Sequence, residues 1–259
     1  MNNNENLLKI ERQSQIRKMV EETGRVTVLE LSAIFDVSEA TIRRDLEELD
    51  GEGWVRRTHG GAVRAERASK EPPIMQRIVE QEAEKKRIGV ATAGMIKAGE
   101  TIFLGSGTTV QEVARNLPKE IQLTIITNSL PVVNHLANYP NLDLIVIGGM
   151  LRHSELSMVG HIAEQAVKEF RADKVILGMH AIDAHHGFTN DFLPETMTDR
   201  AILGIAPQVI VVADHTKFGR VSSGLVVAAT AAHMIVTDQD APKDCVEELI
   251  EMGIEVLQV

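Results

Sequence analysis

Short apolar runs rich in β-branched residues recur along the chain from residue 101 onwards, and they constrain the fold more than any other feature. They cover residues 101–104, 123–127, 142–147, 174–177, 208–213, 233–237 and 254–259. Two of the intervening segments, 110–117 and 246–250, space their apolar residues as a helix does. Strands that are apolar on both faces and alternate with helices are typical of a mostly parallel sheet covered by helices on both sides. We therefore predict an α/β domain over residues 75–259.

The first 64 residues have a different character, with short helical patterns and many arginines. A first amphipathic helix is predicted by the spacing of Ile10, Ile16, Met19 and Val20. Gly24 is expected to end this helix. Thr27 can then cap a second helix, which reaches Phe35 and should bury Leu31, Ile34 and Phe35.

A third helix is expected after a short turn, with Ser38 as its N-cap. Ile42, Leu46 and Leu49 form one buried stripe in it. The opposite face carries polar and small residues, with Thr41 at its margin: Glu39, Ala40, Arg43, Arg44 and Glu47. Base contacts in the DNA major groove come from the first turns of such a helix, and arginine can pair with guanine there. The pattern therefore predicts a recognition helix.

A basic segment follows the third helix. Residues 54–67 contain four arginines against one glutamate, a net charge of +3. Two extended arms around His59-Gly60-Gly61 predict a β-hairpin in which the glycines supply positive φ at the tip. Arg56 and Arg57 in this wing are suited to neutralise DNA phosphates, which makes affinity dependent on salt.

Two other interpretations account for the arginines when they are considered by themselves. The arginines could be solvated surface residues of a small helical domain, or the helix-turn-helix could bind only protein. The run VSEATIRRDL at 37–46, followed by RTHGGA at 57–62, is more specific. It resembles the DeoR (GlpR-like) family of sugar-metabolism transcription regulators, and the resemblance extends over nearly the whole chain. We therefore expect a winged helix-turn-helix that binds double-stranded operator DNA. The residues expected at the DNA are Ser38, Glu39, Thr41, Arg43, Arg44, Arg56, Arg57, His59 and Gly60.

Glycines and polar residues follow the predicted strands at their carboxyl ends, where open α/β sheets bind ligands. The segment GSGTT at 105–109 joins a strand to a helix, so its amides and hydroxyls suit an anion. It is neither a Walker loop nor the dinucleotide fingerprint, because the required lysine and third glycine are missing. Lys217 suits a phosphate, and three carboxylates suit sugar hydroxyls. The candidate effector residues are Gly105, Ser106, Gly107, Thr108, Thr109, Thr127, Asn128, Ser129, Gly149, Arg152, Asp183, Glu195, Asp214 and Lys217.

The segments 105–109, 127–129, 148–149 and 214–219 are similar to those of the DeoR-family effector domain. The resemblance implies the ribose-5-phosphate isomerase-like fold, a phosphorylated sugar as effector, and a repressor of a sugar-catabolism operon that the effector releases from DNA. Two stretches, 178–186 and 194–200, are less typical of the family. We also expect a homo-oligomer, a dimer or tetramer, because paired recognition helices lie one DNA turn, about 34 Å, apart on an operator.

An isomerase that acts on sugar phosphates is the alternative function. It needs a carboxylate base and an electrophile, for which Glu195 or Asp214 with Lys217 are candidates. The attached DNA-binding module favours a sensor, so we predict a regulator and not an enzyme. The histidines at 180, 185 and 186 are candidate zinc ligands, but we expect them to belong to an ordinary polar loop. We predict no metal and no cofactor.

Composition sets the remaining limits. A single cysteine, Cys245, among 259 residues excludes an internal disulfide and a site of several thiolates. The net charge of −10 argues against non-specific nucleic-acid binding by the whole chain, so DNA binding must use local basic surface. No apolar run approaches the ~20 residues of a membrane helix, and the first residues lack a signal-peptide pattern, so we expect a cytoplasmic protein. Pro72-Pro73 in the polar stretch 65–74 predicts a linker between residues 1–64 and 75–259.

Overall fold

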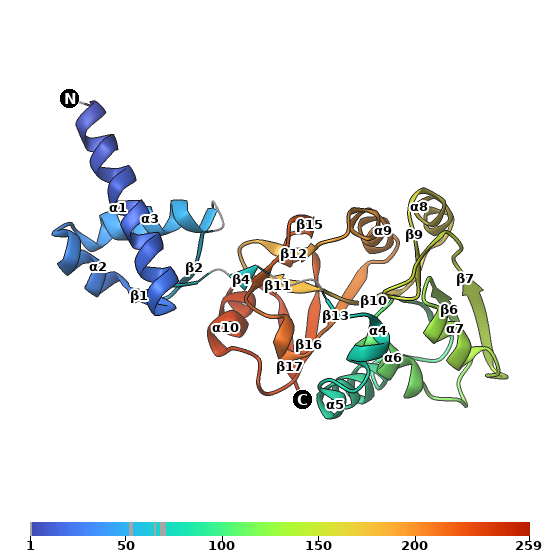
Figure 1. Cartoon of the computed structure of the whole chain (residues 1–259). Helices are drawn as coiled ribbons and strands as arrows, with labels where there is room; N and C mark the ends of the chain where they lie inside the picture. Colours follow the sequence, from blue (N-terminus) through green and yellow to red (C-terminus); the bar gives the residue numbers. More distant parts are fainter. Residues whose placement is uncertain (1, 52–53, 65, 68–70) are drawn as a thin grey trace. The chain divides into compact units, whose positions relative to one another are not determined.

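The computed structural model describes residues 2–51, 54–64, 66–67 and 71–259 (Figure 1). The chain divides into two compact units, Met1–Arg67 and Ala68–Val259. Among the described residues we find no helix with the length and hydrophobicity of a membrane span.

The first unit combines helices with a small antiparallel sheet. Its helices are α1 (Asn2–Thr23), α2 (Val28–Phe35) and α3 (Glu39–Gly51). Strands β1 (Arg25–Thr27), β2 (Val55–Thr58) and β3 (Gly61–Arg64) pair in the order β1-β3-β2, and β4 (Glu66–Arg67) follows. The core is formed by apolar side chains from all of α1, α2, α3 and the sheet, including Ile16, Leu31, Ile42, Leu46, Leu49, Val55 and Ala62. The predicted winged helix-turn-helix is confirmed, with β1 as an additional strand.

Local sequence sets the ends of α2. The Glu30 N–H donates to Thr27 Oγ1 at 3.2 Å, and the Glu30 carboxylate accepts from the Thr27 N–H at 2.9 Å, which makes a capping box. Asp36, with φ of 50°, ends the helix. The expectation that Ile34 is buried is wrong, since 57% of it is exposed. The buried stripe begins at Val28, and Ile34 lies about 120° around the helix from it.

The tip of the wing differs from the prediction as well. Neither Gly60 nor Gly61 has a positive φ, so the expectation that they supply one is wrong. Gly61 instead pairs with Thr27 of β1. A Cβ on Gly61 would lie 2.0 Å from the Val26 carbonyl oxygen and 2.7 Å from the Thr27 Cα. The close approach of β1 to β3 is therefore what requires glycine here.

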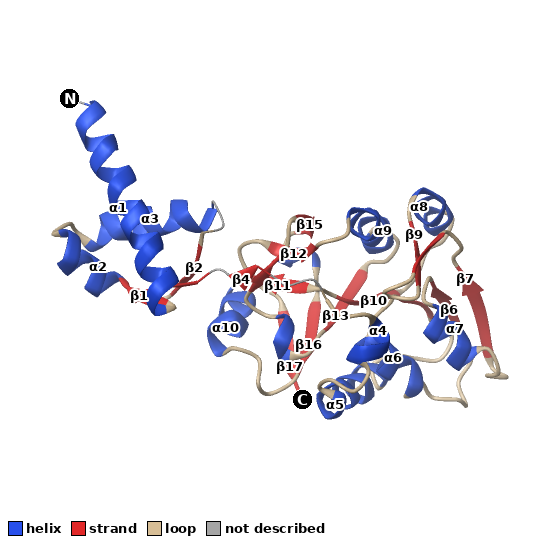
Figure 2. Ribbon diagram, in the orientation of Figure 1, coloured by secondary structure: helices blue, strands red, loops and turns tan. Residues whose placement is uncertain are grey.

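The second unit is built on a parallel sheet (Figure 2). Its strands are β5 (Thr101–Leu104), β6 (Leu123–Thr127), β7 (Leu142–Val146), β10 (Lys174–Gly178), β13 (Gln208–Val212), β16 (Met234–Thr237) and β17 (Glu255–Gln258). The order is β17-β16-β13-β10-β5-β6-β7, and every neighbouring pair is parallel. These are the predicted apolar runs, so the α/β prediction is confirmed.

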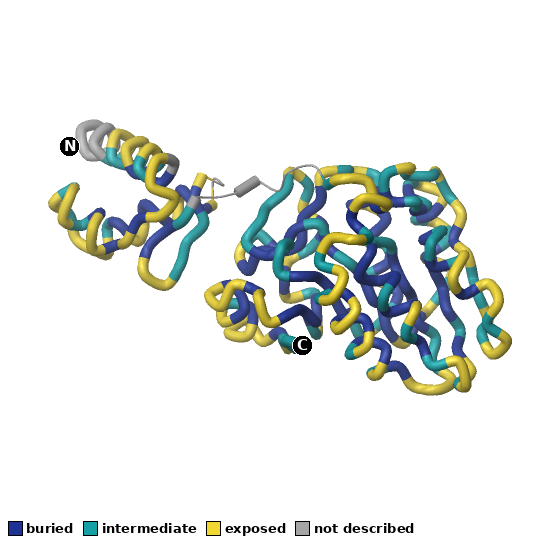
Figure 3. Tube along the Cα trace, turned by 60° about the horizontal axis from the view of Figure 1, so that its bottom comes forward, coloured by how far each residue is buried: buried dark blue, intermediate teal, exposed yellow. Residues whose placement is uncertain are grey.

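Helices cover both faces of this sheet, whose five inner strands are largely buried, while the edge strands β7 and β17 are partly exposed (Figure 3). Ile102 and Ile176 belong to the apolar cluster on one face, with α5 (Glu82–Ala93), α6 (Thr108–Arg115) and α7 (Leu130–Leu136). Phe103 and Val175 belong to the cluster on the other face, with α8 (His161–Lys168), α9 (Leu193–Leu203) and α10 (Lys243–Glu251). The alternation of neighbouring residues between the two clusters follows from the two-residue period of a strand.

Smaller elements surround the carboxyl edge of the sheet. Strands β11 (Ala181–Asp183), β12 (Gly187–Asn190) and β15 (Gly224–Val227) form an antiparallel sheet, and β8 (Met150–Arg152) pairs with β9 (Ser157–Val159). The short elements are α4 (Ile74–Arg77), η1 (His215–Lys217), η2 (Ala229–Ala231) and β14 (Arg220–Val221). The alternating apolar runs did not predict these elements, because each is short and lacks a repeated pattern.

The strand order reverses between β5 and β10. From β5 the sheet continues through β6 to β7, and β10 then lies on the opposite side of β5. The segments that follow β5 and β10 therefore lead away from each other at the carboxyl edge. Such a reversal leaves the crevice in which open α/β sheets bind ligands.

Candidate functional site

The exposed face of α3 is the candidate DNA-contacting surface of the first unit. Ser38 caps the helix, because the Thr41 N–H donates to Ser38 Oγ at 3.2 Å. Ile42, Leu46 and Leu49 face the core, as predicted. Asp45 is buried and binds Arg12 of α1 at 2.5 Å, so α1 covers a second side of the helix. On the face away from the core, Glu39, Ala40, Arg43, Arg44 and Glu47 are exposed.

The wing is attached to the end of α3. The Arg57 N–H of β2 donates to Asp50 Oδ1 at 3.1 Å, and Asp50 is buried in the last turn of α3. The Arg57 side chain is half-buried, and His59 and Gly60 are exposed at the tip. The Arg17 guanidinium of α1 lies over the Trp54 ring. The side chains of Arg64 and Arg67 lie outside the described residues.

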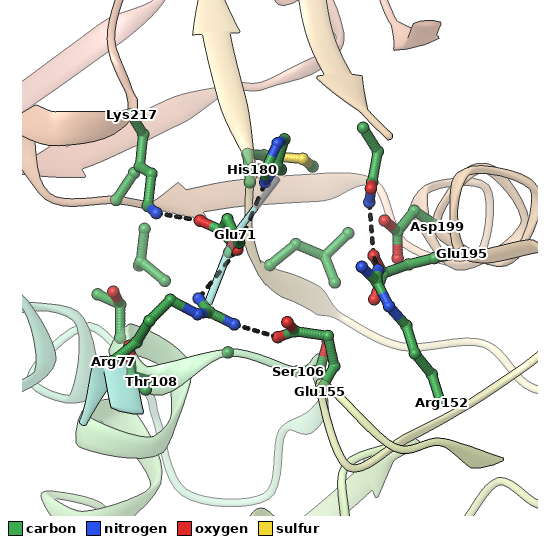
Figure 4. A pocket seen from close by; sticks show the side chains of 18 residues that line it. Glu71, Arg77, Ser106, Thr108, Arg152, Glu155, His180, Glu195, Asp199 and Lys217 are labelled. Carbon is green, nitrogen blue, oxygen red and sulfur yellow. Dashed lines mark hydrogen bonds and ion pairs between the residues drawn. The ribbon is translucent and has the colours of Figure 1, made fainter. Parts of the chain in front are cut away.

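The second unit has a pocket at the reversal point of its sheet (Figure 4). Segments after β5 and β10 form its floor, and α4, α9, η1 and the β8–β9 hairpin contribute its walls. The lining residues are Glu71, Arg77, Ser106, Gly107, Thr108, Thr109, Arg152, Glu155, Leu177, Gly178, Met179, His180, Asn190, Glu195, Asp199, Val212, Ala213 and Lys217. We call this the effector pocket.

One end of the effector pocket gathers positively charged side chains around the Glu71 carboxylate. Glu71 is paired with Lys217, lies 3.0 Å from Arg77 Nη1, and lies 3.4 Å from His180 Nδ1. Arg77 also pairs with Glu155. Burial alone would raise the pKa of Glu71, but the hydrogen bond from His180 and the charges of Lys217 and Arg77 lower it to about 2. Glu71 is therefore a bound carboxylate anion.

The other end is built on Arg152 and Glu195, which form an ion pair. The Asn190 side-chain amide donates to Glu195 Oε2 at 2.6 Å. Burial, helped by the charge of Glu195 and opposed by Arg152, raises the pKa of Asp199 well above its ordinary value. A protonated Asp199 can donate a hydrogen bond as well as accept one. This end therefore offers both donors and acceptors.

The N-terminus of α6 opens onto the same pocket. Gly107, with φ of 110°, precedes the helix, and no side chain caps it. The first amides of a helix lack partners within it and carry a partial positive charge. Ser106, Thr108 and Thr109 add hydroxyls beside them. This terminus suits an anionic group.

Models of two protein families match the chain. The DeoR-like helix-turn-helix domain covers residues 12–68, and the DeoR C terminal sensor domain covers residues 80–239. The chain belongs to the DeoR family. It is thus a transcription regulator with a sensor domain rather than an enzyme, as predicted.

Relatives of this DeoR-family regulator match it along most of their length. The transcriptional repressor AccR of Agrobacterium fabrum is 36% identical over 229 residues, covering 88% of this chain and 89% of that protein. The repressor CsqR of Escherichia coli K12 is 35% identical, covering 95% and 94%. The glycerol-3-phosphate regulon repressor of the same organism is 33% identical, covering 95% and 97%.

Among solved structures, the chain is similar to ribose 5-phosphate isomerase A from Methanocaldococcus jannaschii, with 16% identity and a TM-score of 0.40 over 54% of this chain and 55% of that chain.

The structure brings half of the candidate effector residues of this DeoR-family regulator into the pocket. These are Ser106, Gly107, Thr108, Thr109, Arg152, Glu195 and Lys217. Gly105 lies just behind them, where a Cβ would approach Leu177 Cδ2 to 2.3 Å. The strand-end argument found Ser106, Gly107, Thr108, Thr109 and Lys217 because the pocket lies beyond the ends of β5 and β13, whereas Arg152 and Glu195 reach it from β8 and α9.

Four further candidates lie at the β8–β9 hairpin and not in the pocket. The Asn128 side-chain amide donates to the Met158 carbonyl at 2.9 Å, and Thr127 Oγ1 accepts from the Ser129 N–H at 3.1 Å. Gly149 lies close to Val159 of the same hairpin. Thr127, Asn128, Ser129 and Gly149 thus join β6 to the hairpin and do not line the pocket.

Asp183 and Asp214 shape their own loops, outside the pocket. Asp183 accepts hydrogen bonds from the N–H groups of His185 and His186 and pairs with His186 Nδ1 at 3.0 Å. Asp214 caps η1 by accepting from the Thr216 N–H at 3.0 Å. Asp214 therefore does not line the pocket, whereas Glu195, the other carboxylate considered in the isomerase alternative, lines it together with Lys217.

The histidines weighed as zinc ligands have separate partners. His180 lies against Glu71, His186 against Asp183, and His185 Nε2 lies 3.8 Å from Glu248. Within the described part of the chain, the group that comes close enough to hold an ion is a different one, His215 with Asp238 and Asp240.

Sequence reasoning missed the residues that complete the effector pocket. Glu71 was assigned to the linker, and Arg77, Glu155, His180, Asn190 and Asp199 were not selected as effector residues. Most of them lie outside the strand ends on which the selection rested. The sequence contains one signal for this end of the pocket, an acidic residue, Glu71, and a basic residue, Arg77, on either side of a proline pair. In the structure the Arg77 guanidinium also donates to the Pro72 carbonyl at 2.9 Å.

Proposed function

We propose that this chain represses a sugar-catabolism operon and leaves its operator DNA when a phosphorylated sugar binds in the effector pocket. The observation that carries the proposal is the division of one pocket into a cationic end at Lys217, Arg77 and His180 and a polar end at Arg152 and Glu195. The name of one relative, the glycerol-3-phosphate regulon repressor, supports a phosphorylated effector.

The cationic end suits the phosphate. Lys217 and Arg77 supply fixed positive charge, and the uncapped N-terminus of α6 supplies amide donors from the adjacent wall. The Nε2 atom of His180 is buried and has no hydrogen-bond partner among the described residues. A phosphate group offers three acceptor oxygens, enough to reach donors on more than one wall.

The polar end suits the hydroxyl groups of the sugar. Hydroxyls both donate and accept hydrogen bonds. Glu195 offers acceptor oxygens, and Arg152 and Asn190 offer donors. Asp199 offers either role, because its raised pKa favours the protonated form. A ligand with a phosphate at one end and several hydroxyls at the other matches both ends of the pocket.

In the first unit, we propose that the exposed face of α3 enters the major groove and that the wing contacts the phosphates. The contacting residues are the predicted set Ser38, Glu39, Thr41, Arg43, Arg44, Arg56, Arg57, His59 and Gly60. Residues 1–64 would then act as the DNA-binding domain and residues 75–259 as the sensor domain, connected by 65–74. A homo-oligomer would place two recognition helices about 34 Å apart on the operator.

A thermal-shift panel of phosphorylated sugars, each paired with its unphosphorylated sugar, tests the effector. A true effector at 100 times its Kd adds ~2.7 kcal/mol to the free energy of unfolding and releases DNA in an anisotropy assay. Lys217→Gln should abolish both responses, whereas the exposed Lys97→Gln control should retain them. If no phosphorylated sugar in the panel stabilises the protein beyond its unphosphorylated partner, the proposal fails.

A further inference from the structure

Glu71 occupies the place at which the proposed function puts a phosphate. Its side chain, 14% exposed, lies between Lys217, His180 and Arg77 (Figure 4). It comes from the segment before α4, and 146 positions separate it from Lys217 in the sequence. The pocket therefore already holds an anion, which the chain itself supplies.

The segment that carries Glu71 is fastened to the second unit at several further points. The Ile74 N–H donates to the Ser154 carbonyl at 2.7 Å, and the Ile74 side chain is buried. Arg77 pairs with Glu155, and the Lys85 ammonium holds the Arg77 carbonyl at 2.7 Å. Two of these contacts, at Ser154 and Glu155, belong to the loop that joins β8 to β9. Glu71 is thus one member of a set of contacts that share Arg77 and the pocket wall.

Glu71 also lies four positions after Arg67, the last residue of the first unit. The segment that carries Glu71 is therefore the described part of the second unit that lies nearest to the first unit in the sequence.

We propose that Glu71 is an internal counter-anion, that the phosphate of the effector replaces it at Lys217, Arg77 and His180, and that this exchange frees residues 71–74 while Arg77 stays in the pocket. The inference rests on the proposed function. A phosphate dianion carries more charge and more acceptor oxygens than a carboxylate, so it satisfies the same donors better. Two anions held at the same cations repel each other, so phosphate binding expels Glu71.

Calorimetric titration of the full-length protein with inorganic phosphate tests the exchange. The Glu71→Gln variant keeps the size of the side chain and removes the competing charge, so it should bind phosphate ~10-fold or more tightly than the wild type. The exposed Glu80→Gln variant, in the neighbouring turn, is the matched control and should bind as the wild type does. Equal phosphate affinity in all three proteins would overturn the proposal.

Hydrogen exchange on the wild-type protein provides a second measurement that needs no variant. Saturating phosphate should accelerate exchange at the amide of Ile74, while it slows exchange at the amides of 107–109. If Ile74 stays protected while 107–109 becomes protected, phosphate binds without displacing Glu71 and this inference fails while the proposed function stands. If neither the wild type nor Glu71→Gln binds inorganic phosphate or any phosphorylated sugar, both fail.

Discussion

The buried carboxylate of Asp50 holds the backbone of Arg57 through a hydrogen bond of 3.1 Å, and this contact joins α3 to the wing. The donor is the main-chain N–H, so the Arg57 guanidinium takes no part in it. The last turn of α3 and the first residues of β2 therefore keep their relative position whatever side chain stands at 57.

This separation makes Arg57→Ala a clean test of phosphate contact. The wing should keep its place, and only the charge should be lost. We expect the slope of log affinity against log salt concentration to fall by ~1, with similar losses on operator and random DNA. Fluorescence anisotropy at several salt concentrations measures both, and an unchanged slope would remove Arg57 from the contact set.

Arg43→Ala should behave differently, because Arg43 lies on the exposed face of α3 and pairs only loosely, at 3.5 Å, with Glu39. We expect a loss of ~1–3 kcal/mol in binding to the operator and little change on random DNA. Fluorescence anisotropy with both DNAs gives the ratio of operator affinity to random-DNA affinity for the variant and the wild type. Equal operator affinity of the variant and the wild type would contradict a base-reading role.

The two wing glycines should respond in opposite ways to alanine. In Gly61→Ala the new Cβ meets the backbone of β1 at 2.0 Å, so β1 and β3 must separate, at a cost of ~1–3 kcal/mol in unfolding free energy. In Gly60→Ala the Cβ finds no atom within 4 Å, and φ is not positive. That variant should be neutral or up to ~1 kcal/mol more stable. Denaturant unfolding measures the unfolding free energy of both variants. Similar losses in the two variants would refute the explanation that the close approach of β1 to β3 requires glycine at 61.

Glu71 should contribute to stability in a defined pH range. Its pKa in the folded protein is about 2, against an ordinary value of 4.5. A lowered pKa means that the contribution is complete above the ordinary value and disappears as pH falls toward the folded value. We expect the wild type to exceed Glu71→Gln by ~1–3 kcal/mol near neutral pH, and this difference to shrink below about pH 4.5. Parallel denaturation curves at several pH values measure it, and a difference independent of pH would exclude the ionised pair.

The architecture could be predicted from the sequence because the apolar periodicity of each strand and helix is contained in a few consecutive residues. Each strand of the parallel sheet appears as its own apolar run, and Thr27 and Ser38 are recognisable caps. The effector pocket was only half predictable, because its cationic end depends on pairs such as Glu71 and Lys217 that are far apart in the sequence. Asp183 and Asp214 were selected because each follows a strand, but both lie outside the pocket. A carboxylate at such a position can also close its own turn by accepting hydrogen bonds from backbone N–H groups, as both do here.

The position of Glu71 has a consequence for thermodynamic linkage. If one exchange reaction both fills the pocket and frees the segment leading to the DNA-binding unit, the two equilibria are reciprocal. Operator DNA must then weaken effector binding by the same factor by which the effector weakens DNA binding. The sensor of a repressor on its operator would therefore respond only at a higher sugar concentration than the sensor of the same repressor free in solution.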